Sequence, residues 1–375
     1  MIIGIPKEVK ADENRVSLTP DKIDLLVRSG HTVLVQASAG EGADFKDSEY
    51  EAVGATIVGN AKDIFEQADM IVKVKEPQSQ EYEMFRENQI MFTYLHLAAE
   101  PELTRALVAA KVAGVAYETV QEDNGSLPLL YPMSEIAGRL APQIAARLLQ
   151  NLSGGPGKLL SGVPGTEPCH VAVTGGGTVG FNAASVAKAM GANVTIADIS
   201  LQRLRDISQI SHGAIKTLVA TPANVASLLH QSEVAVGAVL VPGAKAPKVI
   251  TSEMVHEMRD KSIIIDVAID QGGSVENIRQ TSHQEPTYLV GGVMHYAVPN
   301  MPGIVANTSS VSLSNATYPY VLKLAEQGLK KAMEKDSAIA KGVNTLNGHV
   351  TYQAVAEAMD VEYVPVAEAF AGKGI

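Results

Sequence analysis

The sequence predicts an α/β protein with two Rossmann-like, doubly wound domains, whose sheets are mostly parallel and whose first domain is discontinuous. Three observations support this prediction. The chain has 375 residues, which suits two domains better than one. Apolar, β-branched runs alternate with amphipathic stretches in two separate blocks. A glycine-rich turn opens the second block and is followed by a helical pattern.

Composition and charge exclude several classes of protein. Hydrophobic residues make up 46% of the chain and charged residues 19%, which is typical of a globular protein. The formal net charge of −11 disfavours nucleic-acid and membrane partners. Cys169 is the one cysteine, so neither an internal disulfide nor a cysteine-based zinc site can form, and we expect no metal. Without a leader or a membrane-spanning stretch, a cytoplasmic location is expected.

The first block alternates strands and helices. A helix is predicted over residues 19–30, with Thr19 as N-cap, Pro20 in the first turn and Gly30 at the end. A polar, turn-rich break follows at residues 121–133. Strands are predicted at residues 2–6, 32–36, 70–74, 90–95 and 112–120.

The second block follows a long helix. Apolar residues spaced by four predict that helix over residues 134–152, with Ser134 as its cap, and a Gly/Pro-rich loop follows. From about residue 305 the pattern changes to helices without a compact core of their own, so these residues are expected to return to the first domain. The predicted domains are therefore residues 1–133 plus 307–375, and residues 134–306. Strands are predicted at residues 170–175, 193–198, 234–240 and 262–268.

A dinucleotide-binding motif lies at the start of the second block. Gly175, Gly177 and Gly180 match the G-x-G-x-x-G spacing between a predicted strand and a predicted helix. Gly175 allows a tight turn, Gly177 allows a pyrophosphate to approach closely, and Gly180 allows the helix to pack closely on the strand. Asp198 ends the next strand and can accept hydrogen bonds from a ribose, which favours NAD over NADP. Arg203 either brackets the adenosine, pairs with Asp198, accommodates a 2′-phosphate, or is simply solvated; a glycine turn without a ligand is the plain alternative.

Candidates for chemistry stand at predicted strand ends of the first domain, where ligands bind in such sheets. Lys75 and His96 each follow a strand, and Arg15 lies in the loop after the first strand. Each has a plainer interpretation: an exposed ion pair for Arg15, a solvated lysine, and a structural histidine. In the second domain Asp270 ends an apolar strand beside a Gly-Gly turn, whereas Asp266, inside that strand, is expected to be structural.

With these residues placed, the chain resembles the bacterial NAD-dependent alanine dehydrogenases, in the family that also holds the transhydrogenase alpha subunits. The resemblance covers essentially the whole chain. It implies reversible oxidative deamination of L-alanine to pyruvate and ammonium, with NAD as cofactor, in a homohexamer. The segments that carry it are MIIGIPKEVKADENRVSLTP, IVKVKEP, TYLHLAAE, YPMSEIAGRLAPQIAA, SGVPGTEP, IIIDVAIDQGG and HYAVPNMPG.

The resemblance also implies roles for individual residues. His96 and Asp270 would form the acid/base pair, and the discontinuous domain would bind substrate while residues 134–306 bind NAD. Substrate would contact Arg15, Lys75, Tyr94, Met133 and Asn300, with Tyr94 and Met133 as walls of a small pocket. Beyond the glycine motif, NAD would contact Ser134, Thr178, Val179, Asp198, Arg203, Ala220, Val239, Leu240, Val267, Ala268, Ile269, Asp270, Arg279, Val298, Pro299, Asn300 and Met301. Ala220 departs from the family pattern, which has a serine there.

Three alternatives remain open at this point. The chain could be a soluble nucleotide-binding module related to transhydrogenase, which would need membrane partners. It could be a dehydrogenase of a larger amino acid such as lysine or saccharopine. It could also be a non-catalytic NAD-binding regulator, which any turnover would exclude.

Overall fold

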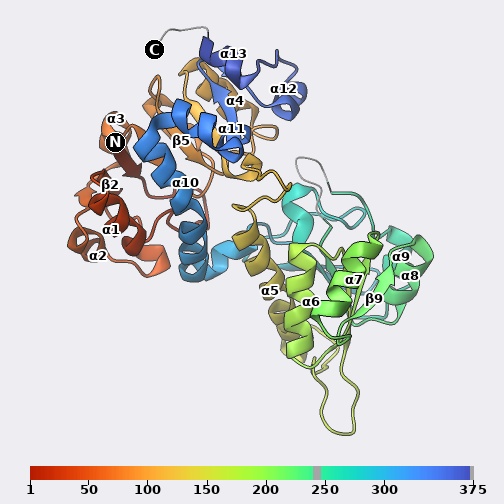
Figure 1. The fold of residues 1–375 in the computed structure, drawn as a ribbon. Helices are drawn as coiled ribbons and strands as arrows, with labels where there is room; N and C mark the ends of the chain where they lie inside the picture. The colour runs from red at the N-terminus through yellow and green to blue at the C-terminus, as the bar shows by residue number, and fades with distance from the viewer. Residues whose placement is uncertain (240–245, 372–375) are drawn as a thin grey trace. The chain divides into compact units, whose positions relative to one another are not determined.

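The computed structural model describes residues 1–239 and 246–371. The chain divides into two compact units (Figure 1). Unit 1 comprises Met1–Met133 and Gly303–Ile375, and unit 2 comprises Ser134–Pro302. Each unit holds one mostly parallel sheet flanked by helices, so the predicted fold class is confirmed.

The sheet of unit 1 has eight strands in the order β15-β14-β6-β5-β4-β1-β2-β3. The first six strands of the chain are parallel, and β14 and β15 add an antiparallel edge. The chain therefore reverses its direction of winding between β1 and β4. The strands are β1 (Ile2–Ile5), β2 (Thr32–Gln36), β3 (Thr56–Val58), β4 (Met70–Val72), β5 (Ile90–Thr93), β6 (Ala113–Ala116), β14 (Val343–Leu346) and β15 (His349–Val350).

Helices cover both faces of this sheet. Side chains alternate across a strand, so in β4 Met70 and Val72 join one apolar cluster and Ile71 joins the other. The first cluster includes Leu313 and Val321 of the long helix α10. The helices of unit 1 are α1 (Pro20–Arg28), α2 (Asp47–Ala52), α3 (Ala61–Gln67), α4 (Pro101–Ala109), α10 (Ala306–Lys335), α11 (Ser337–Gly342), α12 (Gln353–Met359) and α13 (Val366–Ala371), with the 3-10 turns η1 (Glu41–Ala43), η2 (Ser79–Met84) and η3 (Tyr117–Thr119).

The sheet of unit 2 has seven strands in the order β12-β13-β11-β10-β7-β8-β9. All are parallel except the edge strand β12, and the direction of winding reverses between β7 and β10. This is the order of nucleotide-binding sheets of the Rossmann type. The strands are β7 (His170–Thr174), β8 (Asn193–Asp198), β9 (Lys216–Val219), β10 (Val234–Gly237), β11 (Ile263–Asp266), β12 (Thr287–Val290) and β13 (Val293–Tyr296).

Helix α5 departs from the sequence prediction. It runs over Tyr131–Leu148, so Ser134 lies inside its first turns and is not the cap. Its Gly138 packs on α6, since a Cβ there would lie 2.3 Å from the carbonyl oxygen of Val179. Unit 2 also contains α6 (Thr178–Ala189), α7 (Leu201–Ile210), α8 (Pro222–His230), α9 (Ser252–His256), η4 (Asn151–Ser153) and η5 (Val267–Gln271), and η6 (Met301–Val305) ends at α10.

The cap of α1 also differs from expectation. Thr19 precedes the helix in an extended conformation, but its side chain makes no capping hydrogen bond. Its hydroxyl contacts Asp21 and Ser314 instead, so it helps to join the first loop to α10. Gly30, with φ of +85°, lies just beyond the helix end, as its left-handed conformation favours.

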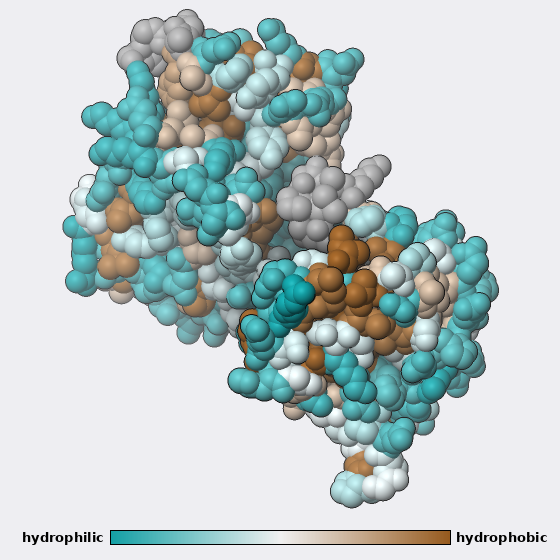
Figure 2. Space-filling view, turned by 45° about the vertical axis from the view of Figure 1, so that its right-hand side comes forward, coloured by the Kyte–Doolittle hydropathy of each residue, from teal (hydrophilic) through white to brown (hydrophobic). Residues whose placement is uncertain are grey.

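Most of the surface shown in Figure 2 is hydrophilic, with apolar patches on both units. The buried apolar side chains form clusters on the faces of the sheets. Within the described part of the chain, no helix is long and apolar enough to cross a bilayer.

Candidate active site

The candidate residues of unit 1 follow neighbouring strands. Arg15 lies in the loop after β1, Lys75 follows β4, and Tyr94 and His96 follow β5. The strands β1, β4 and β5 are parallel neighbours, so their carboxyl ends share one edge of the sheet. The direction of winding reverses between β1 and β4. Open α/β sheets bind ligands at the carboxyl ends of the strands at such a point.

Arg15 is a buried cation with a dedicated counter-charge. The residue is 2% exposed, so its interpretation as an exposed ion pair was wrong. Its Nε donates to Glu13 Oε1 at 2.7 Å, its Nη2 pairs with Glu13 Oε2, and its Nη1 contacts Met133 Sδ at 3.0 Å. Burial disfavours the charge, but the hydrogen bonds that Arg15 donates to Glu13, together with the negative charge of Glu13, outweigh it and raise the pKa of Arg15. Sequence reasoning missed Glu13, which resembles the acidic residues around it.

The backbone around Arg15 is fixed by α10. The amide of Val16 donates to Ser310 Oγ at 3.0 Å, and the amide of Thr19 donates to Ser314 Oγ at 3.0 Å. Both serines are fully buried. The loop that carries Arg15 is therefore held by a helix that is distant in the sequence.

Lys75 is a half-buried cation at the end of β4. Its carbonyl oxygen accepts a hydrogen bond from Thr93 Oγ1 at 3.0 Å, which ties it to β5. The next residue, Glu76, is buried and pairs with Lys10. Burial acts to raise the pKa of Glu76, but Lys10 and Lys75 outweigh it and lower that pKa. Lys75 therefore adds positive charge just beyond the carboxyl end of β4.

His96 has an exposed ring on a constrained backbone. Its φ is +50°, and its amide donates to Glu118 Oε1 at 2.6 Å. The ring stacks on that of Tyr94, with centroids 6.0 Å apart and planes at 10°. No partner for the ring nitrogens occurs among the described residues, so the interpretation as a satisfied structural histidine is not favoured. Glu118 was not predicted; its position in η3, directly after β6, is the signal that could have found it.

Tyr94 and Met133 stand beside these groups. Tyr94 is 4% exposed, and its hydroxyl donates to the Leu129 carbonyl oxygen at 2.6 Å. Burial raises the pKa of Tyr94. Met133 is half-buried against Arg15. Within unit 1 the structure thus places Arg15 against Met133 and Tyr94 against His96, and an electrostatic interaction links Arg15 to Tyr94.

The glycine-rich turn of unit 2 joins β7 to α6. Gly175 has φ of +95°, and a Cβ at Gly180 would lie 1.8 Å from the Gly175 carbonyl oxygen. Gly176 is held by two charged side chains: its amide donates to Asp198 Oδ2 at 2.6 Å, and its carbonyl oxygen accepts from Arg203 Nε. Arg203 also lies over the Phe181 ring at 5.5 Å. Arg203 is therefore neither plainly solvated nor shown to pair with Asp198.

These residues fit a dinucleotide. A Cβ at Gly177, the N-cap of α6, would meet no heavy atom within 4 Å, so the protein leaves space before the helix N-terminus. Helix N-termini attract phosphate through their unpaired amides. Asp198 ends β8, and each of its oxygens accepts one backbone amide, from Gly176 or Ser200, which leaves further acceptor capacity on each oxygen.

Two of the other predicted cofactor contacts, Ala220 and Val239, lie at the same edge of the unit 2 sheet, after β9 and β10. The Ala220 amide donates to the Asp198 carbonyl oxygen at 3.0 Å, and Val239 would be 3.1 Å from a Cβ at Gly175. The Arg279 guanidinium lies 4.1 Å from the Tyr288 ring centre, so it packs on this ring. Leu240 lies outside the described residues. Four further predicted contacts are half-buried: Ser134 in α5, Thr178 and Val179 in α6, and Pro299. Two others, Val298 and Met301, are buried.

Asp266 is the last residue of β11, and Asp270 lies beyond it in η5, so the strand ends earlier than the sequence predicts. Asp266 is fully buried and accepts hydrogen bonds from the amides of Ala268, Ser274 and Val275, and burial raises its pKa. Its role is structural, since it shapes the turn η5. Asp270, on that turn, is exposed.

Asp270 contacts another predicted site residue. Its carboxylate oxygens lie 3.2 and 3.3 Å from the backbone amide nitrogen of Asn300. Asn300 has φ of +54°, a conformation that asparagine tolerates better than most residues. Among the described residues, no group of three or more His, Cys, Asp or Glu side chains could hold a metal ion.

Comparison with known proteins identifies the family. Residues 4–137 match the family model "Alanine dehydrogenase/PNT, N-terminal domain", and residues 141–353 match "Alanine dehydrogenase/PNT, C-terminal domain". The chain is 52% identical to an alanine dehydrogenase of Methanococcus maripaludis, over 98% of this chain and 99% of that protein. It is 50% identical to an alanine dehydrogenase of Bacillus subtilis, over 98% and 97%.

Solved structures agree with this assignment. A structure titled L-alanine dehydrogenase matches with a TM-score of 0.93 and 47% identity, covering 96% of this chain and 99% of that one. A transhydrogenase from Sinorhizobium meliloti matches with a TM-score of 0.81 but only 24% identity, covering 94% and 100%, and so shows the fold alone. Both family models and the near-full-length relatives lead to one conclusion: this chain belongs to the alanine dehydrogenase/PNT family.

Proposed function

We propose that this chain is an NAD-dependent L-alanine dehydrogenase, which interconverts L-alanine with pyruvate and ammonium. The observation that carries the proposal is that proteins named alanine dehydrogenase align with nearly the whole chain and are identical to it at about half of the aligned positions. Arg15, Lys75 and His96 lie in the segments that follow the neighbouring strands β1, β4 and β5 of unit 1, which supports the proposal further. The proposal includes a homohexamer and a cytoplasmic location, as the family resemblance implies.

Unit 1 supplies the groups that would handle the substrate. The Arg15 guanidinium, kept charged by Glu13, would bind the substrate carboxylate. Lys75 would polarise the carbonyl oxygen of pyruvate, and Tyr94 and Met133 would restrict the space for the side chain to a methyl group. The His96 ring would take or give a proton, as histidine does in general acid–base catalysis.

Unit 2 supplies the groups that would hold NAD. The turn at Gly175, Gly177 and Gly180 would receive the pyrophosphate, and Asp198 would accept hydrogen bonds from the ribose hydroxyls. When bound, NAD accepts a hydride from the substrate carbon. Asp270 would act as a second acid/base group, and its carboxylate would hold Asn300 through the Asn300 backbone amide.

A spectrophotometric assay of NAD reduction tests the proposal. The purified chain is assayed with L-alanine, L-serine, glycine and L-lysine, and with NAD or NADP. We expect turnover with L-alanine and NAD well above every other combination. Preference for lysine would favour a dehydrogenase of a larger amino acid, and absence of any turnover would favour a transhydrogenase-like module or a regulator.

A further inference from the structure

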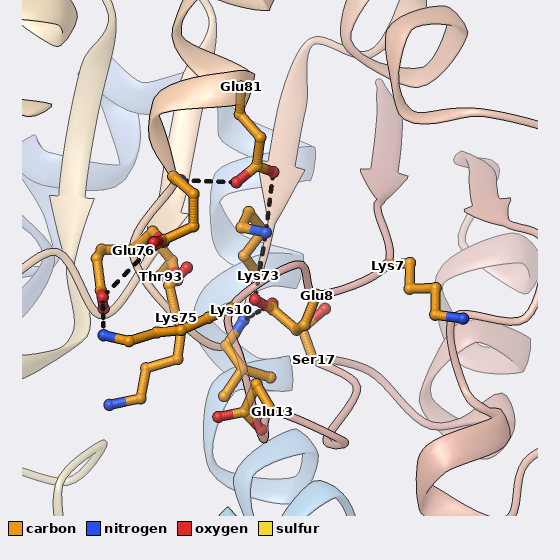
Figure 3. Close-up of polar contacts among 12 residues, drawn as sticks. Lys7, Glu8, Lys10, Glu13, Ser17, Lys73, Lys75, Glu76, Glu81 and Thr93 are labelled. Carbon is orange, nitrogen blue, oxygen red and sulfur yellow. Dashed lines mark hydrogen bonds and ion pairs between the residues drawn. The ribbon is translucent and has the colours of Figure 1, made fainter. Parts of the chain in front are cut away.

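A buried cluster of three charged residues, Glu8, Lys73 and Glu81, includes and contacts the chain just before Lys75, and none of the roles assigned above uses it. The Lys73 side chain is fully buried between two carboxylates. Its Nζ lies 3.2 Å from Glu8 Oε2 and 3.0 Å from Glu81 Oε1. Figure 3 shows the Lys73 amine between these two groups, with the Lys75 side chain extending away from them.

Glu8 connects the two segments that carry the proposed substrate cations. It belongs to the loop over residues 6–19, which also carries Arg15. Its Oε1 accepts the amide of Val74, the residue before Lys75, at 2.6 Å, while its Oε2 faces Lys73. One carboxylate from the Arg15 loop therefore fixes the backbone immediately before Lys75.

Further bonds hold the same two segments together. Ser17 Oγ donates to the Val72 carbonyl oxygen at 2.7 Å, and Lys10 pairs with Glu76, the residue after Lys75 (Figure 3). On the far side, Glu81 Oε2 accepts the Gln78 amide at 2.8 Å. The chain is thus tied down on both sides of Lys75.

Stability alone does not explain this cluster. Removing a lysine and two glutamates from water is costly, and well-packed apolar residues of similar volume often serve stability equally well or better. Burial raises the pKa of Glu8, with the attraction of Lys73 opposing it. Burial also disfavours the charge on Lys73, but Glu8 and Glu81 outweigh it and raise the pKa of Lys73. The lysine therefore stays charged, and what it adds is a directed link between the segments.

We propose that Glu8 is a positioning residue which, through Lys73 and the Val74 amide, sets the place of Lys75 relative to Arg15. The inference rests on the proposed function, because that function gives both cations to one substrate. Arg15 and Lys75 would have to meet a carboxylate and a carbonyl that are joined by one bond, so their spacing is critical. A shift of one of them would misalign the carbonyl while leaving NAD binding by unit 2 intact.

The first test replaces the cluster by neutral residues of similar size in the triple variant Glu8→Met/Lys73→Met/Glu81→Gln, which also removes the acceptor of the Val74 amide. The control is Lys323→Met, which removes a lysine from another ion pair of unit 1, with Asp336. We expect the triple variant to stay folded and keep its NAD affinity but to lose at least about tenfold in kcat for alanine and pyruvate, since a displacement near 1 Å can cost about 100-fold. Wild-type kcat and KM in a folded triple variant would overturn the proposal.

A second comparison decides the matter if the triple variant does not fold. Glu8 reaches the Val74 amide from the Arg15 loop, whereas Glu81 lies in η2 and makes no such link. Glu8→Ala, which removes the acceptor of the Val74 amide, should therefore reduce kcat more than Glu81→Ala does. Equal losses of kcat in the two variants would show a merely structural cluster.

Hydrogen exchange gives a readout that does not depend on turnover. In Glu8→Ala the Val74 amide loses its acceptor, so the peptide over residues 70–78 should exchange faster than in the wild type or in Lys323→Met. Unchanged exchange would overturn the positioning role. If the wild type showed no turnover of alanine, the proposed function would fail, and the exchange result would still decide whether Glu8 fixes this segment.

Discussion

Replacing Gly177 by alanine separates the folding role of the glycine-rich turn from its role toward a ligand. A Cβ there would meet no heavy atom within 4 Å, and φ is −64°, which alanine adopts without strain. Alanine is a poorer N-cap than glycine, but it restricts the unfolded chain more. These effects oppose each other, so the free energy of unfolding should change by less than about 1 kcal/mol.

The affinity for NAD should change much more. The added methyl group would occupy the space through which the pyrophosphate reaches the amides of α6. A hydrogen bond to a charged group contributes about 1.5–3 kcal/mol. Loss of one such bond would raise the Kd for NAD by roughly 10- to 150-fold.

Gly180→Ala is the matched comparison. Its Cβ would lie 1.8 Å from the Gly175 carbonyl oxygen, where ordinary contacts begin at 3.4 Å. Backbone atoms cannot rotate away as a side chain would, so α6 and β7 must separate. Overpacking of this kind typically costs about 1–3 kcal/mol, and here both stability and NAD affinity should fall.

Calorimetric titration with NAD and thermal unfolding without ligand measure the two effects separately. Gly177→Ala should unfold like the wild type but bind NAD weakly, whereas Gly180→Ala should be impaired in both. Wild-type NAD affinity in Gly177→Ala would refute the placement of the pyrophosphate at this turn. A large fall in its melting temperature would refute the reasoning from open space.

Three further predictions concern charged side chains. His96→Ala should lower kcat at least about 100-fold by removing the acid/base group, with NAD affinity in titration calorimetry unchanged; retained turnover would contradict its role. Glu13→Ala should lower the free energy of unfolding in urea by about 3–5 kcal/mol, because it leaves the Arg15 guanidinium buried without its counter-charge; a loss under 1 kcal/mol would argue against that pairing. Burial acts to raise the pKa of Glu233, but Lys158 and neighbouring donors outweigh it and lower that pKa. Ionised Glu233 therefore stabilises the fold above its unfolded pKa of about 4.3. This stabilisation decreases as the pH falls below that value. Glu233→Gln should therefore melt below the wild type at pH 7, with a difference that shrinks in acid; a constant difference would contradict the assignment.

The sequence could predict those parts of the site that depend on local pattern. The turn at Gly175 lies between β7 and α6 as its spacing indicates, and Asp198 ends β8. Asp266 and Asp270 could be told apart because Asp266 belongs to an apolar strand and Asp270 lies close to a Gly-Gly turn, although the strand ends at Asp266 and not at Asp270. Each of these features is fixed by residues within a short stretch of chain.

What the sequence could not predict depends on contacts between distant segments. Lys73 resembles a solvated lysine until Glu8 and Glu81 are brought to it by the fold. The partner of the His96 amide, Glu118, arrives from the end of another strand. Short or exposed strands such as β3 and β9 also escaped prediction, since β3 has only three residues and β9 is largely exposed. Helix α5 begins three residues before Ser134, so a suitable capping residue alone did not mark its start.

The six parallel strands of each unit follow the same spatial order, β3-β2-β1-β4-β5-β6 in one and β9-β8-β7-β10-β11-β13 in the other. The framework itself therefore does not decide what a unit recognises. The difference begins in the first connection, which is a compact turn at residues 175–177 in one unit and a charged loop over residues 6–19 in the other. Engineers who wish to retarget either half should accordingly rebuild that single crossover and leave the strands untouched.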